Sequence, residues 1–278
     1  MKKIWKYRFY YYLALPGLVY FIIFHYVPMA GALIAFKDIS PFDGLQGFFD
    51  APWVGLKHFE RFTSSVYFYD VIENTLIISG LKILFGFPAP IIFALLLNEV
   101  LRMSLKRVMQ TISYLPHFIS WVVTAGMITA LLATSGGLIT ETINDFTGSS
   151  INFLGNKDYF VGILVTSHVW KTIGWSSIIY LAAMSSIDPA LYESARIDGA
   201  NRLQMAWHIT LPSIMFVIVI MFLLEIGNLL EAGFEQILLL YSPSVYKVAD
   251  IIDTFVYREG LLALKYSFAA AVGLFKAV

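Results

Sequence analysis

The sequence predicts an all-α protein that crosses a membrane several times, with six transmembrane helices in the intact chain. Hydrophobic side chains make up 58% of the 278 residues and charged side chains only 14%, whereas soluble proteins average about 25% charged residues. Several apolar windows reach the roughly 20 residues that a helix needs to cross a bilayer. The chain has no cysteine and zero net charge, which excludes disulfides and thiolate metal sites and gives no basic footprint for nucleic acid.

The six apolar stretches are expected to form one transmembrane domain over residues 1–278. We place the spans near residues 12–35, 73–97, 109–133, 160–184, 213–232 and from 266 onward. The first stretch is too long for the core of a signal peptide and lacks a small-residue cleavage pattern, so we expect it to be retained. The last contains only about 13 residues, too few to cross a bilayer, so the natural chain is expected to continue beyond Val278.

The orientation of these spans follows from the positive-inside rule, by which cytoplasmic loops are enriched in Lys and Arg. Basic residues crowd the short segments before the first span, between the second and third, and between the fourth and fifth: Lys2, Lys3, Lys6, Arg8, Arg102, Lys106, Arg107, Arg196 and Arg202. The longer segments on the other side carry most of the acidic residues. The N-terminus and the segment 187–212 are therefore predicted to be cytoplasmic.

Segment 187–212 is a polar island that contains start and stop signals for two short helices. Asp188 is a natural N-cap, and Pro189 suits the first helical position. Gly199 supplies the left-handed residue that ends the first helix. Asn201 with Gln204 forms a capping-box pattern for a second helix. We therefore predict a helix, a sharp turn and a second helix outside the bilayer.

The island also carries small, acidic and apolar residues in a fixed order: Glu193-x-Ala195-x-x-Asp198-Gly199-Ala200, then Ile209-x-Leu211-Pro212. This order resembles the EAA loop of permease subunits in bacterial ABC importers, with Ser194 in place of the first of two usual alanines. Along much of its length the chain is similar to the maltose-permease-like carbohydrate type, and within it to the LplB-like sugar permease branch. A bare Glu-x-Ala would favour an ordinary amphipathic connector between two membrane helices, but the ordered combination favours the family.

The resemblance implies that this loop couples the chain to a cytoplasmic ATPase by inserting a short helix into a cleft. The residues expected to make that contact are Leu191, Tyr192, Glu193, Ala195, Arg196, Asp198, Gly199 and Ala200. It also implies that the chain lies in the lipid of the bacterial cytoplasmic membrane as a heterodimer with a second permease. The other implied partners are two ATPase subunits and an extracytoplasmic solute-binding protein. The implied cargo is a carbohydrate, an oligosaccharide in particular. A permease for peptides or another polar solute, and a non-transporting assembly or sensor subunit, remain alternatives.

Motifs for catalysis are missing from the sequence. It contains no phosphate-binding Gly-x-x-x-x-Gly-Lys-Ser/Thr, no His-Glu-x-x-His and no Gly-x-Ser-x-Gly, and its five histidines are scattered rather than spaced as metal ligands. We therefore expect a permease that is not an enzyme and binds neither metal nor cofactor. ATP and Mg²⁺ would be used by the partner ATPase subunits.

Ionisable residues within the predicted spans are candidates for the translocation path, because charges at membrane depth are costly and usually face a cavity or a partner. In the fourth span, His168, Lys171 and Trp175 lie on one face of the helix. In the fifth span, Glu225, Asn228 and Glu231 fall within a third of the helix circumference. These stripes could line the path, with Trp175 as a platform for sugar rings. Alternatively, an internal Lys171–Glu225 ion pair or an ion pair between subunits fixes helix packing, and Trp175 is a packed core residue. We expect Lys82 to extend its ammonium outward to the membrane surface.

Overall fold

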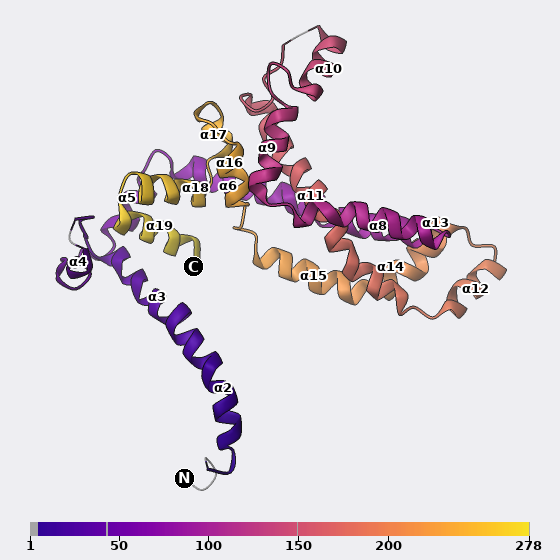
Figure 1. Ribbon diagram of the computed structural model, residues 1–278, viewed down its shortest axis with the longest axis horizontal. Coiled ribbons are helices and arrows are strands. Elements are labelled where there is room, and N and C mark those ends of the chain that lie inside the picture. Colours follow the sequence, from indigo (N-terminus) through magenta and orange to yellow (C-terminus); the bar gives the residue numbers. More distant parts are fainter. Residues whose placement is uncertain (1–4, 43, 149, 278) are drawn as a thin grey trace. The chain divides into compact units, whose positions relative to one another are not determined.

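The computed structural model describes residues 5–42, 44–148 and 150–277, and within them every regular element is a helix (Figure 1). The one β-type pairing described is an isolated bridge between Lys37 and Trp53. The all-α prediction is therefore confirmed. Lys2, Lys3 and Val278, used in the orientation and span predictions, lie outside the described residues. The chain divides into two compact units, a terminal unit of residues 1–69 and 252–278 and a central unit of residues 70–251.

The terminal unit joins the two ends of the sequence. Its helices are α2 (Arg8–Phe21), η1 (Ile22–Tyr26), α3 (Val27–Ala30), η2 (Gly31–Phe36), α4 (Gly44–Asp50), α5 (Lys57–Thr63), α18 (Ile252–Val256), η5 (Tyr257–Leu262) and α19 (Tyr266–Ala277). The first four run on as 29 residues, Arg8–Phe36, long and apolar enough to cross a membrane, yet only 6% of the apolar window is buried by the rest of the chain. Lipid or another subunit must therefore cover these side chains.

An aromatic cluster holds the remainder of the terminal unit together. Phe62 on α5 is fully buried, and its ring lies 5.8 Å from that of Phe255 and 5.4 Å from that of Phe275, measured between centroids. The backbone N–H of Ile39 donates to Ser267 Oγ at 3.1 Å across 228 residues of sequence. The first seventy residues and the last thirty are thus parts of one folded unit.

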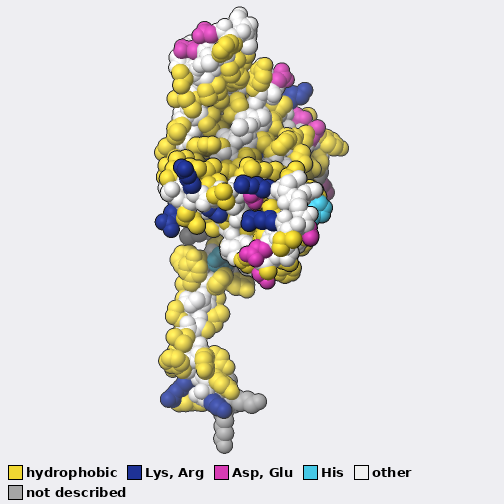
Figure 2. All heavy atoms as spheres, turned by 90° about the vertical axis from the view of Figure 1, so that its right-hand side faces the viewer, with side chains coloured by type: hydrophobic (Ala, Val, Ile, Leu, Met, Phe, Trp, Pro, Cys, Tyr) yellow, Lys and Arg dark blue, Asp and Glu magenta, His cyan; other side chains and the backbone are white. Residues whose placement is uncertain are grey.

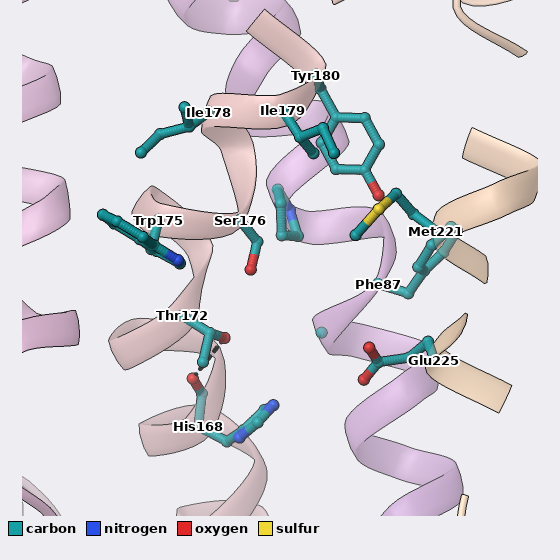
Figure 3. A pocket seen from close by; sticks show the side chains of 12 residues that line it. Phe87, His168, Thr172, Trp175, Ser176, Ile178, Ile179, Tyr180, Met221 and Glu225 are labelled. Atoms are coloured by element: carbon teal, nitrogen blue, oxygen red, sulfur yellow. Dashed lines mark hydrogen bonds between the residues drawn. The ribbon is translucent and has the colours of Figure 1, made fainter. Parts of the chain in front are cut away.

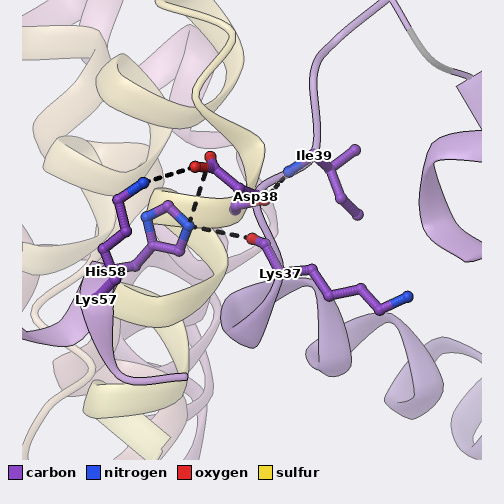
Figure 4. A network of polar contacts seen from close by, with 6 residues as sticks. Lys37, Asp38, Ile39, Lys57 and His58 are labelled. Atoms are coloured by element: carbon purple, nitrogen blue, oxygen red, sulfur yellow. Dashed lines mark hydrogen bonds and ion pairs between the residues drawn. The ribbon is translucent and has the colours of Figure 1, made fainter. Parts of the chain in front are cut away.

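The connection between η2 and α5 is ordered by polar contacts (Figure 4). Lys57 Nζ lies 2.7 Å from Asp38 Oδ2, and this hydrogen bond holds the pKa of Asp38 below its usual range. The buried His58 ring has Nε2 at 3.1 Å from the carbonyl oxygen of Lys37. Lys37 Nζ donates in turn to the carbonyl of Phe48 at 2.7 Å. Because the Asp38 pair is half exposed, it contributes little stability, and the buried Lys37 and His58 contacts define the loop.

The central unit contains the helices that surround the candidate site. They are most of α6 (Phe68–Gly86), then α7 (Pro88–Asn98), α8 (Met103–Phe118), α9 (Trp121–Leu131), α10 (Leu138–Thr147), α11 (Lys157–Ser185), α12 (Pro189–Ile197), α13 (Arg202–Met205), η3 (Ala206–Thr210), α14 (Leu211–Ser213), α15 (Met215–Gly227), α16 (Phe234–Leu240), η4 (Pro243–Val245) and α17 (Tyr246–Ala249). The 29-residue α11 contacts α7, α8, α15 and α17. It therefore forms the axis of this unit.

The expected span 109–133 falls on one bent helix pair, and the expected span 213–232 overlaps the second helix of another. Helices α8 and α9 meet at 101°, and the stretch Arg202–Ser213 meets α15 at 66°. In the described part of the chain, two continuous helices, Arg8–Phe36 and Phe68–Asn98, have the length and composition to cross a membrane, or up to four if each bent pair counts as one span. Length and composition thus support a chain that crosses the membrane more than once.

A buried polar network ties α6 to α11 and α16. Lys82 Nζ donates to the carbonyl of Ala232 at 2.7 Å and to Gln236 Oε1 at 2.5 Å. The Gln236 amide donates to the carbonyl of Leu164 and to Ser167 Oγ, both at 2.8 Å. Lys82 is only 5% exposed, so our expectation that it reaches outward is wrong. The hydrogen bonds inside the unit replace those that water would have made.

Candidate translocation pocket and coupling loop

A pocket of about 630 Å³ lies between the α6–α7 junction, α11 and α15 (Figure 3). Its lining residues are Gly86, Phe87, Pro90, His168, Thr172, Trp175, Ser176, Ile178, Ile179, Tyr180, Met221 and Glu225. Three of them, Phe87, Trp175 and Tyr180, are aromatic, and Thr172, Ser176 and Tyr180 carry hydroxyl groups. Apolar walls with a few convergent polar groups are typical of small-molecule sites.

Three of the predicted path residues line this pocket. His168 on α11 and Glu225 on α15 point toward each other across it, whereas Trp175 lines its edge on the side of α11 away from Glu225 (Figure 3). The Trp175 ring stacks on that of His117 with 4.6 Å between centroids and 4° between planes, yet 43% of Trp175 remains exposed. One indole face is therefore braced, while part of the side chain stays accessible to a ligand.

Lys171 does not line the pocket, although it lies one turn before Trp175. Its side chain is only 7% exposed, and Nζ donates to the carbonyls of Pro116 at 3.0 Å, His117 at 3.2 Å and Ile119. Within the described residues it forms no ion pair with Glu225. The alternative of an internal Lys171–Glu225 pair is therefore wrong. A lysine can satisfy its donors with backbone carbonyls where a helix ends, and these carry no sequence signature.

Asn228 and Glu231 do not extend the Glu225 stripe. Helix α15 ends at Gly227, so both residues lie beyond it. The Asn228 side chain donates back to the carbonyl of Leu224 at 3.1 Å. The prediction that these three residues share a helix face is wrong because the helix is shorter than its apolar pattern.

Several lining residues were not predicted. Phe87, Tyr180 and Met221 contribute apolar wall, and a Cβ at Gly86 would lie 3.5 Å from the His168 ring. The sequence did offer a signal for the Gly86 contact: a glycine followed by Pro88 and Pro90. Such a run marks a helix break, where another side chain can approach the backbone closely. The apolar wall residues carry no comparable signal in a chain this hydrophobic.

The segment 187–212, the candidate coupling loop and called the coupling loop below, folds as its capping residues predict. The Asp188 carboxylate accepts from the N–H of Ala190 at 2.9 Å, and Pro189 opens α12. Asn201 and Gln204 form the reciprocal capping box, at 2.9 and 2.8 Å, that opens α13. These local predictions are confirmed.

The turn between α12 and α13 depends on Gly199, whose φ is +80°. The N–H of Ala200 donates to the carbonyl of Ala195 at 2.9 Å, and that of Gly199 to the carbonyl of Arg196 at 3.1 Å. This pair of bonds is the Schellman arrangement, which requires a left-handed residue after the helix. The turn thus sets the direction of α13 relative to α12.

The two faces of the coupling loop differ. Leu191, Ile197 and Leu203 are 50%, 87% and 77% exposed, so they are available to a partner. The Tyr192 hydroxyl lies 2.9 Å from Thr210 Oγ1, which turns this predicted contact residue back toward η3. Figure 2 looks onto the end of the molecule that carries this loop and shows basic and acidic side chains gathered there.

An ion pair connects the coupling loop to the transmembrane helices. Arg202 at the start of α13 lies 3.5 Å from Glu99, which follows α7. A hollow of about 310 Å³ lies beside the turn, lined in part by Asp198, Gly199 and His208. Of the predicted coupling residues, Ala195 and Ala200 also line it. The loop therefore presents a hollow surface and is linked by the Arg202–Glu99 ion pair to the end of α7. Helix α7 also contributes Pro90 to the lining of the pocket.

Known proteins resemble this chain along almost its whole length. YteP of Bacillus subtilis (strain 168), described as the polygalacturonan/rhamnogalacturonan transport system permease protein, is 46% identical over 275 residues, which cover 99% of this chain and 85% of YteP. Protein LplB of the same organism is 44% identical over 268 residues, which cover 96% of this chain and 83% of LplB.

Solved structures agree with these relatives. One chain of a bacterial ABC transporter involved in the import of the acidic polysaccharide alginate matches with a TM-score of 0.91 and 43% identity, covering 99% of this chain and 92% of that one. A chain of the bacterial alginate ABC transporter in complex with an alginate pentasaccharide-bound periplasmic protein matches with a TM-score of 0.90 and 42% identity, covering 99% and 91%. The family described as binding-protein-dependent transport system inner membrane component matches residues 86–278. This chain therefore belongs to that family of membrane permeases.

Proposed function

We propose that this chain forms half of the translocation path of an ABC importer for a carbohydrate, with an oligosaccharide as cargo. The observation that carries the proposal is the pocket lined by Trp175, His168 and Glu225. An exposed indole offers a flat apolar face for a sugar ring, and the polar groups around it can exchange hydrogen bonds with sugar hydroxyls. One relative is named for polygalacturonan/rhamnogalacturonan transport, and one similar solved transporter is involved in the import of the acidic polysaccharide alginate.

The relatives, rather than the pocket, favour an acidic cargo. The described lining includes the Glu225 carboxylate and contains neither Lys nor Arg, and Lys171 is occupied by backbone carbonyls. A uronic acid would therefore bind with its neutral hydroxyls toward Glu225 and its carboxylates turned toward the rest of the path. We propose that the other half of the transporter balances that charge.

The remaining partners of the proposed importer follow from the family. A solute-binding protein would deliver cargo from outside, a second permease would complete the path as a heterodimer, and two ATPase subunits would bind ATP and Mg²⁺. ATP binding would close the ATPase dimer, draw the coupling loops together and open the path outward. The exposed apolar residues of α12 and α13 support this role, since such residues mark interaction sites.

Replacing Trp175 with alanine tests the pocket. Loss of one aromatic contact of ~1–1.5 kcal/mol should lower uptake of oligogalacturonides by roughly five- to tenfold in proteoliposomes that contain the whole importer. The matched control is Trp170→Ala, because Trp170 lies on the same helix with similar exposure, 44% against 43%, but outside the pocket. Equal uptake by both variants would contradict the proposed path. Uptake of a peptide in place of the sugar would favour the alternative cargo.

Cysteine labelling tests the proposed orientation against a background free of native cysteine. Leu203→Cys, on α13, should react with an impermeant thiol reagent only from the cytoplasmic side. Asp145→Cys, on the exposed surface of α10, should react only from outside. Reversed sidedness at both positions would place the coupling loop away from any ATPase and refute the coupling role.

A further inference from the structure

We propose that Lys171 is a positioning residue: it holds the break between α8 and α9 in its bent form and thereby fixes the aromatic wall of the pocket. The break lies at Ile119 and Ser120, whose ψ angles of 133° and 154° are extended. Two extended residues between helices interrupt the helical hydrogen bonding at the end of α8, where the described backbone bond is that from the N–H of Ile119 to the carbonyl of Pro116, at 3.3 Å. At membrane depth no bulk water replaces those hydrogen bonds.

The two helix ends at the break are satisfied separately. On the α9 side, Ser120 Oγ accepts from the N–H of Val123 at 3.3 Å. On the α8 side, the Lys171 ammonium donates to the carbonyls of Pro116, His117 and Ile119. A cation there also complements the negative end of the α8 dipole. Lys171 Nζ lies 5.3 Å from the centroid of the Trp121 ring, which opens α9. One side chain from α11 therefore contacts both helices of the bent pair.

His117 connects the Lys171 contacts to the pocket. Its carbonyl accepts from Lys171, while its ring stacks on Trp175, one helical turn beyond Lys171 on α11. The Phe118 ring meets Trp175 edge-on at 5.3 Å. When the end of α8 is held against α11, the indole is braced on the side away from the ligand. Without Lys171, the end of α8 and both rings would be free to shift.

The test measures the bend itself, in the complete importer in nanodiscs without cargo. Spin labels at Ile112→Cys on α8 and Met127→Cys on α9 report the distance across the break. Both sites are exposed, and neither is among the residues that Lys171 is described as binding, which are Pro116, His117, Ile119 and Trp121. Lys171→Met should broaden the distance distribution and shift its maximum. Lys171→Arg, which keeps a cation with several donors, should restore a narrow distribution. Lys106→Met, also on α8 but away from the break, is the matched control and should not change it.

Two results would overturn the proposal: an unchanged distribution in Lys171→Met, or a distribution in Lys171→Arg as broad as that in Lys171→Met. If Lys171→Met does not assemble, Lys171→Gln takes its place, and a narrow distribution there would also refute the need for a cation. The consequence for the pocket rests on the proposed function, but the bend does not. A change in the distance with unchanged uptake of oligogalacturonides would therefore support the role of Lys171 and refute the path through the pocket.

Discussion

Gly174→Ala is expected to prevent stable assembly of this chain into a transporter. A Cβ at this position would overlap the backbone carbonyl group of Ser113 on α8 and lie 2.9 Å from its Cβ. A flexible side chain could move aside, but the backbone of a helix cannot do so without displacing the whole helix. Overpacking commonly costs ~1–3 kcal/mol, and overlap with main-chain atoms should reach the upper part of that range or exceed it.

The same helix provides the control for this experiment. A Cβ at Gly162 on α11 would meet nothing within 4 Å, and alanine favours a helix over glycine by about 1 kcal/mol. Gly162→Ala should therefore be neutral or stabilising. The measurement is the yield and thermal unfolding midpoint of the purified complex in detergent. Wild-type yield and midpoint for Gly174→Ala would show that α8 and α11 do not pack as closely as described.

Gly199→Val is expected to abolish transport while leaving assembly intact. The position is open, since a Cβ would meet nothing within 4 Å, so the effect comes from the backbone angle alone. A residue with a side chain pays roughly 1–2 kcal/mol in the left-handed region, and a β-branched one is least suited to it. The turn can relieve this strain only by giving up the Schellman bonds, and α13 would then point elsewhere.

A conservative replacement separates strain from other effects of the mutation. Gly199→Asn should keep much of the activity, because asparagine adopts left-handed angles more readily than other residues with side chains. Cargo-stimulated ATP hydrolysis and uptake are measured together, with capture of cargo by the binding protein as the check that delivery is intact. Wild-type stimulation in Gly199→Val would refute the coupling role of this turn.

What could be predicted from the sequence depends on the range of the interactions involved. The coupling loop follows from local rules: Asp188, Gly199 and the Asn201–Gln204 box each act on backbone groups within a few residues. The helical class follows from the length of the apolar stretches. In both cases the partners of each residue lie close by in the sequence.

The features that were not predicted depend on distant backbone atoms. Lys171 binds carbonyls more than fifty residues away, and Lys82 binds the carbonyl of Ala232. Hydropathy identifies an apolar stretch but does not show that it bends by 101° at Ser120. Charge on a side chain suggested salt bridges or surface exposure, whereas in this chain the buried ammonium groups serve helix ends and turns.

The hydrogen bond from Ile39 to Ser267 has a consequence for the timing of synthesis. A ribosome adding 5–20 residues per second needs about 10 to 45 seconds to cover the 228 residues between them. Throughout that interval η2 and α5 lack α19, while the central unit, whose sequence is continuous, can already form. The terminal unit is therefore completed last. During that delay its aromatic residues need lipid, insertion machinery or a chaperone to shield them, and mutations that weaken α19 should cause degradation of nascent chains rather than slow transport by finished ones.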